Sequence, residues 1–554
     1  MLAPLLALVI AAQASDSVVA GRVTDSVTRA PLAGAVVTVA GSRAGTITRI
    51  TGADGRFVAP AAGRVRLHVT RAGYAPADRA ATAGDTVAIA LVPAARSLEA
   101  VTVTALRGPA DAPIAQTVID RRAIERRYSG EEMPLLLQSA PAVTAYAESG
   151  AQSNYTYLRL RGIDQTRINV TLDGVPLSEP EDQGIYFSNY PDFGTSIESV
   201  QIQRGVGTSS YGTASYAGAI NFESLSLAGA SRGGELQLGR GSFGSARASA
   251  EYQTGIVGER LALYGRVSDQ RTDGYRYNSG SRAQGAFVSG GWFGERDLVK
   301  VTAFTGRTRN EMAYLASSRE EIAADPRANP LAESDDYHTT LASISYTRAL
   351  GPAAQLATTA YHVDFGGSYD VRIAPELYNF GLASRLSGAF STWSWHSADW
   401  RVDAGVHANT YERDHFAAIR PALGARLYSN TGHKDDVSAF AKASRALGRL
   451  TLFGDVLARR PSFRYVPSAG AGVPGAGIAW TFVNPKVGAT YRVSTPLLLH
   501  VSLGSTGREP TRSDMFAGFD DLDTSNVAFV GTFDRVRPEH VRDLELGASW
   551  RAPR

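Results

Sequence analysis

The residue types that could do chemistry in this chain favour binding over catalysis. There are nine histidines and no cysteine, and no histidine begins an H-x-x-E or H-E-x-x-H zinc signature. Residues 239–244 match G-x-G-x-x-G but lack the helix that a dinucleotide site requires. Asp520, Asp521 and Asp523 lack the glycine and glutamate of a calcium loop, which indicates a solvated loop. We therefore expect no enzyme activity, no cofactor and no metal site.

Aromatic and polar side chains gather in residues 178–195, and more of them lie in residues 146–155. Aromatic rings with a few polar groups suit the capture of a bulky amphipathic ligand. The candidate ligand-binding residues are Tyr146, Gln152, Asn154, Tyr155, Glu181, Asp182, Tyr186, Phe187 and Tyr190. The alternative interpretation is that these side chains pack one domain against another.

Composition sets the broad class of the protein. A net charge of +3 and the lack of a dense Lys/Arg run argue against a nucleic-acid partner. A hydrophobic content of 44% with 56 glycines and 23 tyrosines suits a β-rich protein with many turns. Residues 2–12 are apolar and precede the small-x-small pattern Ala12-Gln13-Ala14, which predicts a signal peptide over residues 1–14. A buried strand or helix is the alternative.

Two regions show strand periodicity of different kinds. Residues 15–93 contain short strands broken by turns, which predicts a small β-sandwich. From residue 229 to 554 the chain has segments of roughly 10 residues with period-two alternation, which is typical of a transmembrane antiparallel β-barrel. Within one such segment Trp400, Val402 and Val406 fall on one face, and Arg401, Asp403 and His407 fall on the other. One face suits lipid and the other a hydrated lumen.

Several motifs carry a resemblance to known families. Gly21-Arg22-Val23-Thr24-Asp25 and Thr51-Gly52-Ala53-Asp54-Gly55-Arg56-Phe57 resemble the carboxypeptidase regulatory-like domain, which carries no catalytic zinc. Four further motifs follow in order: Arg161-Gly162-Ile163, Leu172-Asp173-Gly174-Val175-Pro176, Gln203-Arg204-Gly205 and Tyr216-Ala217-Gly218-Ala219-Ile220-Asn221. These resemble the plug domain of TonB-dependent outer-membrane receptors, a family that imports scarce nutrients through a plugged barrel.

The resemblance implies an α+β plug domain over residues 116–228 and a location in the outer membrane of a Gram-negative-type bacterium, with the N-terminal domain in the periplasm. The implied partners are a TonB-type energising protein, outer-membrane lipid and a nutrient ligand such as a ferric chelate. Residues 94–115 are interpreted as a linker that contains the TonB box, namely Glu99, Ala100, Val101, Thr102, Val103, Thr104 and Ala105. An extended segment of this type can add as a strand to a partner's sheet edge.

Arg161 and Arg204 match plug arginines that, in this family, bond to barrel-wall glutamates, and Glu545 is the candidate wall partner. Such pairs would form a releasable plug latch. Unrelated lumen charges are the alternative for Glu545.

The expected fold is mainly β: a small N-terminal β-sandwich, an α+β plug domain, and a transmembrane antiparallel β-barrel that is C-terminally incomplete. Large plugged barrels have about 22 strands, whereas residues 230–554 supply roughly 14 candidate segments. The expected function is TonB-dependent active import of a scarce nutrient, a ferric siderophore or similar metal chelate. The alternatives are a non-transporting outer-membrane binding or adhesion protein and a nonfunctional truncated receptor.

Overall fold

The computed structural model describes residues 18–26, 29–42, 45–71, 74–92, 107, 112–206, 216–258, 260–351 and 353–550. The chain divides into two compact units, one ending at Ser97 and the other beginning at Leu98. The predicted signal peptide (residues 1–14) and the predicted TonB box (Glu99 to Ala105) lie outside the described residues. No helix in the described part of the chain is long and apolar enough to cross a membrane.

The N-terminal unit consists of two small β-sheets. One sheet has the strand order β4 (Arg56–Pro60), β1 (Val18–Asp25), β7 (Thr86–Leu91), with β1 and β7 parallel. The other has the order β3 (Gly45–Ile50), β2 (Val36–Ser42), β5 (Arg64–Thr70), β6 (Ala77–Thr82). Alternate residues of β5, Val65, Leu67 and Val69, are buried in the core. This alternation is the pattern of a strand with one solvated face.

The plug domain begins the second unit and contains a mixed sheet with two short helices. The sheet order is β13 (Val175–Pro176), β12 (Ile168–Leu172), β15 (Gly218–Ser224), β14 (Ile197–Arg204), β8 (Gln116–Asp120). A smaller sheet has the order β11 (Ile163–Asp164), β10 (Thr156–Leu160), β9 (Val143–Ala147). The helices are α2 (Arg121–Arg127) and α3 (Met133–Leu137), with short 3-10 turns η1 (Gln165–Arg167), η2 (Phe187–Asn189) and η3 (Phe193–Ser196). Every residue of β12 is buried, because both faces of this sheet are covered.

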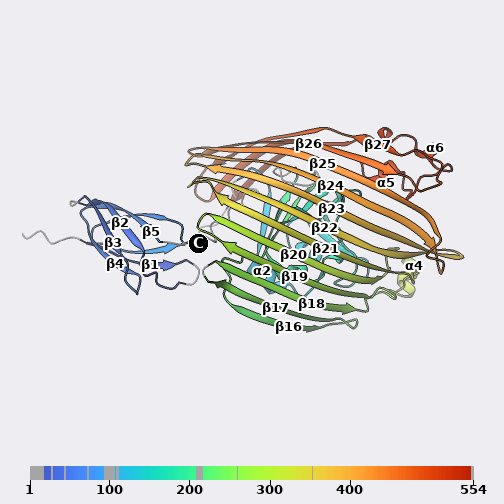
Figure 1. The fold of residues 1–554 in the computed structure, drawn as a ribbon, viewed down its shortest axis with the longest axis horizontal. Coiled ribbons are helices and arrows are strands. Elements are labelled where there is room, and N and C mark those ends of the chain that lie inside the picture. The colour runs from blue at the N-terminus through green and yellow to red at the C-terminus, as the bar shows by residue number, and fades with distance from the viewer. Residues whose placement is uncertain are drawn as a thin grey trace, which may run out of the picture. The chain divides into compact units, whose positions relative to one another are not determined.

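An antiparallel sheet of fifteen strands follows in the described residues, and Figure 1 shows it curving around the plug elements, which are coloured cyan. Strands that are neighbours in the sequence are neighbours in the sheet, except that β27 pairs only with β26. The strands are β16 (Gly233–Arg240), β17 (Ala246–Val257), β18 (Leu261–Thr272), β19 (Ser281–Phe293), β20 (Asp297–Glu311), β21 (Ser334–Ala349), β22 (Ala354–Ile373), β23 (Glu376–His396), β24 (Trp400–Ile419), β25 (Arg426–Leu447), β26 (Leu450–Val466), β27 (Ala476–Ala479), β28 (Phe482–Arg492), β29 (Leu497–Arg508) and β30 (Glu539–Trp550).

The alternation predicted for this region is present in the structure. On β24, Asp403 and His407 are buried on the inner face, whereas Trp400 and Val406 are exposed on the outer face. The expected length of roughly 10 residues per strand is too short for the middle of the sheet, where β25 has 22 residues. These strands are long because their backbone hydrogen-bond pairing continues beyond the apolar outer band. The composition of the sequence does not indicate the residue at which this pairing ends.

The two ends of the sheet differ in the length of their connections. At one end the strands are joined by short turns, such as residues 294–296 and 397–399. At the other end lie longer connections, among them residues 312–333 with α4 (Arg319–Ala324) and residues 509–538 with α5 (Arg512–Met515), α6 (Val527–Val530) and η4 (Phe533–Arg535). An aromatic cluster that includes Phe463, Tyr465 and Phe516 packs the 509–538 connection against β26 and β28. This packing holds the connection over the plug.

Candidate ligand-binding site

A cavity of about 490 Å³ lies between the plug and the inner face of the sheet, near the end with the longer connections. Its walls are dominated by aromatic rings, which come from both the plug and the sheet. Tyr155 and Tyr186 meet edge to face at 6.1 Å between ring centroids, and Tyr337 stacks on Phe365 at 5.1 Å. The other aromatic lining residues are Tyr157, Tyr190, Tyr314, Tyr369, Tyr411 and Phe519. A pocket of this size and chemistry suits an amphipathic small molecule.

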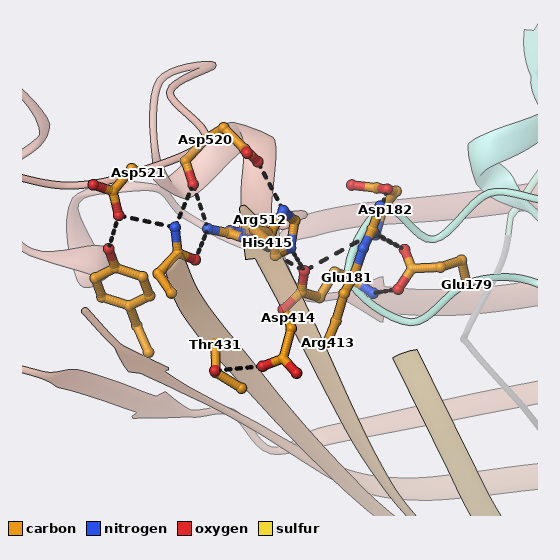
Figure 2. A network of polar contacts seen from close by, with 12 residues as sticks. Glu179, Glu181, Asp182, Arg413, Asp414, His415, Thr431, Arg512, Asp520 and Asp521 are labelled. Carbon is orange, nitrogen blue, oxygen red and sulfur yellow. Dashed lines mark hydrogen bonds and ion pairs between the residues drawn. The ribbon is translucent and has the colours of Figure 1, made fainter. Parts of the chain in front are cut away.

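One wall of the cavity is a network of charges that joins the plug to the sheet (Figure 2). Arg413 on β24 is 5% exposed and reaches the plug loop that precedes η2. Its Nη1 atom lies 2.7 Å from Asp182 Oδ2 and 2.9 Å from Glu179 Oε2. Tyr411, two residues earlier on the same strand, donates a hydrogen bond to Glu179. Because strand side chains alternate, Tyr411 and Arg413 both point toward the plug.

The network extends from the plug to the 509–538 connection through His415. The two ring nitrogens of His415 lie 2.9 Å from Glu181 Oε2 and 2.8 Å from Asp520 Oδ1. Arg512 approaches the same Glu181 oxygen at 3.5 Å and donates hydrogen bonds to Asn430 and to the carbonyl of Asp520. Three separate segments of the chain therefore share one set of charges.

The plug carboxylates of this network differ in proton affinity. Burial, together with the nearby charges of Asp182 and Glu181, raises the pKa of Glu179 to about 7, although Arg413 opposes the shift. Burial acts on Asp182 too, but the charge of Arg413 and its hydrogen bond outweigh it and hold the pKa of Asp182 below its usual value. A ligand that displaced Arg413 would change the charge state of this plug loop.

Four of the nine predicted ligand-binding residues line the cavity: Tyr155, Asp182, Tyr186 and Tyr190. The Tyr155 hydroxyl donates a hydrogen bond to Asp335 Oδ2 on β21 at 2.6 Å, so this ring is also a contact between plug and sheet.

The structure places the other five outside the cavity lining. Asn154 is 1% exposed, and its amide donates hydrogen bonds to the carbonyls of Ser279, Gly280 and Glu311 on the sheet side. Glu181 belongs to the charge network, Phe187 is buried, and Tyr146 stacks on Tyr157. Gln152 is exposed, and its backbone carbonyl accepts a hydrogen bond from the N–H of Glu132. The contacts of Asn154 and Glu181 fit the alternative interpretation, which is packing of the plug against the sheet.

The three predicted latch residues line one hollow, but the two arginines make different direct contacts. Arg161 forms an ion pair with Glu545 on β30, whose side chain is 9% exposed. Arg204 instead bonds within the plug, donating to the carbonyl of Pro141 at 3.0 Å and to the hydroxyl of Thr117. Of the two arginines, Arg161 is the one that pairs with the large sheet. Arg204 is the last residue of β14, where that strand pairs with β8 of the plug's own sheet.

A second plug contact depends on glycines of the sheet. Gly285 on β19 and Gly306 on β20 are register partners, and both face the plug at Pro191. A Cβ atom at Gly306 would lie 2.7 Å from Pro191 Cδ and 2.8 Å from the carbonyl oxygen of Asn189. One at Gly285 would lie 2.9 Å from the carbonyl oxygen of Pro191. The two glycines thus form a notch in the wall, here called the glycine notch, because a side chain at either position would fill it.

Sequence reasoning missed the sheet side of the site. Arg413, His415 and Arg512 were not predicted to meet the plug, and Asp520 and Asp521 were assigned to a solvated loop. Both residues lie in a connection, and the side chain of Asp520 is 40% exposed. Asp520 also contacts His415 and Tyr428, and Asp521 accepts a hydrogen bond from Asn430, which the sequence did not predict. The alternation of Tyr411, Arg413 and His415 on one strand face was the signal that was present in the sequence.

A plug seated against a large antiparallel sheet, with a cavity between them, is the architecture of plugged β-barrels. The family model for the TonB-dependent receptor plug domain matches residues 109–219, and the model for the carboxypeptidase regulatory-like domain matches residues 18–93. The chain is thus similar to TonB-dependent outer-membrane receptors, of which it carries the plug domain and the fold. A search of curated proteins gives no match.

Solved structures with the same fold include three transport proteins. The ferric citrate transporter FecA in its unliganded form is 14% identical with a TM-score of 0.66, and the alignment covers 79% of this chain and 68% of FecA. The copper transporter OprC is 16% identical with a TM-score of 0.65, covering 80% and 72%. The ferric yersiniabactin uptake receptor FyuA from Yersinia pestis is 14% identical with a TM-score of 0.62, covering 80% and 70%. At these identities the likeness is one of fold.

Proposed function

We propose that this protein actively imports a scarce nutrient, a ferric siderophore or similar metal chelate, across the outer membrane with energy from a TonB-type partner. The observation that carries the proposal is the aromatic cavity, because a ligand there touches the plug and the sheet together. Asp182 belongs to the plug and Arg413 to the sheet, and both line the cavity and pair with each other. Ligand binding and plug position are therefore linked through one set of contacts.

The placement of the cavity fits uptake from outside the cell. In outer-membrane barrels the longer connections are extracellular and the short turns face the periplasm. The cavity lies toward the longer connections, among Tyr314, Phe519 and Asp520. As the family resemblance implies, we assign the N-terminal domain and the segment from Glu99 to Ala105 to the periplasm, where a TonB-type partner could reach them.

Arg107 offers a mechanical link between that segment and the plug. It follows the predicted TonB box by two positions and is bound to the two central plug strands. Its guanidinium donates to Ser199 Oγ at 2.7 Å and to the Asn221 carbonyl at 2.9 Å, and it lies 3.2 Å from Glu223 Oε2. A pull on the box would thus be applied directly to β14 and β15.

The experiment removes the box and leaves the cavity intact. In cells supplied with radioactive ferric chelates, deletion of Glu99 to Ala105 is expected to abolish uptake while surface binding persists. Val101→Pro should act similarly, because proline removes a backbone donor needed for strand addition, whereas Val101→Ala is the matched control. Undiminished uptake by the deletion variant would contradict the assignment, and energy-independent retention by the wild type would favour a binding or adhesion protein instead.

A further inference from the structure

Among the residues that the structure describes, every basic residue that lines the aromatic cavity is already paired within the protein. There are three of them, namely Arg413, His415 and Arg512. Each contacts at least one carboxylate of the charge network. Two tyrosine hydroxyls of the lining also donate to carboxylates, in the pairs Tyr155–Asp335 and Tyr411–Glu179. An anionic ligand would have to break one of these buried pairs to gain a cation, which is strongly unfavourable.

Glu148 is the one acidic residue of the described lining that lies outside this network. It directly follows β9 on the plug. Its carboxylate forms no ion pair with any residue that the structure describes. The charge of Arg276 acts on Glu148, but that guanidinium donates hydrogen bonds to the carbonyls of Ala313 at 2.6 Å and Ala328 at 3.0 Å. Glu148 therefore faces the cavity with a charge that the fold leaves without a direct counter-ion.

Other carboxyls make this end of the cavity electronegative. Burial raises the pKa of Glu148 to about 7, although the hydroxyl of Tyr157 opposes the shift. The charges of Glu132 and Asp335 add to it. Neither of these two carboxyls has an ion-pair partner in the described part of the chain. A positive group bound here would stabilise the ionised form of Glu148.

Aromatic rings lie around the same carboxylate. The backbone N–H of Glu148 donates to the carbonyl of Tyr155 at 3.2 Å, and the Tyr155 ring meets Tyr186 edge to face. Tyr157 and Tyr186 line the cavity together with Glu148. The face of a tyrosine ring attracts an organic cation, and a carboxylate accepts charge-assisted hydrogen bonds from an ammonium group. The two kinds of group therefore favour the same ligand chemistry.

We propose that the nutrient bound in this cavity carries an ammonium group, and that Glu148 binds it. The inference rests on the proposed role of the cavity as the site of a metal chelate, and it narrows that chelate to an amine-bearing one. A polyanionic chelate would meet carboxylates at both ends of the cavity. It would find no unpaired cation among the lining residues that the structure describes.

The test uses full-length protein in detergent and two pairs of probes, whose members differ only in the acetylation of one amine. The first pair is the ferric complex of desferrioxamine B, which ends in a protonated amine, and the ferric complex of its N-acetyl derivative. The second pair is phenylpropylamine and its N-acetyl derivative, which hold no metal. Dissociation constants are measured by titration calorimetry. Wild type should bind each amine about 10-fold more tightly than its acetylated partner, as one partly buried charge-assisted contact provides.

Three variants separate charge from shape. In Glu148→Gln the two members of each pair should bind within about 2-fold of each other. Glu148→Asp keeps the charge and should retain a preference for the amine. The control Glu125→Gln makes the same chemical change on α2 of the plug, where the side chain is 55% exposed and outside the cavity lining, and should keep the full preference. Each result is a ratio measured on one sample, so a loss of folded protein does not imitate it.

Equal affinity for amine and acetylated probe in wild type would overturn the inference, and so would a full preference in Glu148→Gln or a failure of both amines to bind. Equal binding and uptake of the two ferric complexes would refute the ammonium site while leaving chelate import in place. Binding of phenylpropylamine that depends on Glu148, with no binding of either ferric complex, would support the ammonium site and count against chelate import.

Discussion

Replacing Arg413 with methionine should release the plug from the sheet. The change keeps an unbranched apolar stem, shortens the side chain and removes the charge that lies 2.7 Å from Asp182 and 2.9 Å from Glu179. A third carboxylate, Glu181, lies 4.0 Å away. Breaking a buried ion pair from one side costs about 3–5 kcal/mol because the remaining charge is left unpaired. The side chain of Asp182 is 32% exposed, so solvent screens part of this cost and about 2–4 kcal/mol is the expected range.

The absence of cysteine from the chain provides the assay. Ser188 lies in η2 on the plug and is 3% exposed, so a Ser188→Cys thiol is alkylated only when the plug opens. In that background Arg413→Met should speed alkylation by roughly 30- to 700-fold, which is the free-energy range converted at 1.4 kcal/mol per decade. Arg420→Gln is the control, because Arg420, just past the end of β24, pairs with Asp370 on β22 and not with the plug loop around Asp182.

A second substitution separates charge from packing. Adding Asp182→Asn to Arg413→Met removes one of the stranded carboxylates and should slow alkylation again, giving a favourable coupling in the double-mutant cycle. The reasoning is wrong if Arg413→Met alkylates within about 3-fold of its background. It is equally wrong if Asp182→Asn speeds the reaction further.

Two more perturbations test the plug by other means. Gly306→Ala should destabilise the seating of the plug by about 1–3 kcal/mol, because the added methyl group clashes with Pro191. The measurement is the urea midpoint for protease cleavage of the plug, and Gly265→Ala, with open space at its Cβ, is the control that should leave it unchanged. Equal midpoints for the two variants would show that the glycine notch does not determine plug seating. Burial raises the pKa of Glu132 from 4.5 to about 7 against hydrogen bonds from Thr156 and Asn154. The folded plug then binds this proton more tightly than the unfolded chain, so its stability should fall by about 1–3 kcal/mol as pH rises from about 4.5 to 7. Glu132→Gln should flatten that profile, and an unchanged slope would refute the assignment.

The sequence was sufficient to predict the architecture, because the patterns that indicate it lie within short stretches of the chain. Period-two alternation around Trp400 and Asp403 predicts the two faces of β24, and the structure has both. The order of the plug motifs around Arg161 and Gly205 is likewise a local pattern, and the plug family model matches there. Strand length was not predictable, since alternation shows which face a residue takes but not where the ladder ends.

The site was predicted only on its plug side. Tyr155, Asp182, Tyr186 and Tyr190 were recognised because aromatic and acidic residues are dense in a short segment. Their partners on the sheet, such as Arg413, are more than two hundred positions away and meet them only through the register of the strands. Pairing across such a distance depends on tertiary structure, so sequence pattern gives the candidates but not the contacts.

The glycine notch separates two demands on the same strands. Gly285 and Gly306 pair with each other in the ladder. The nearest sheet atoms to an added Cβ are Ser268 Oγ at 3.3 Å from Gly285 and Phe304 Cζ at 3.0 Å from Gly306. Pro191 occupies the space that those side chains would fill. A side chain at either glycine would therefore meet its closest obstruction in the plug, at 2.7 to 2.9 Å, rather than in the sheet. The residue type at these two positions of the sheet is therefore set chiefly by the plug, a neighbour from another domain.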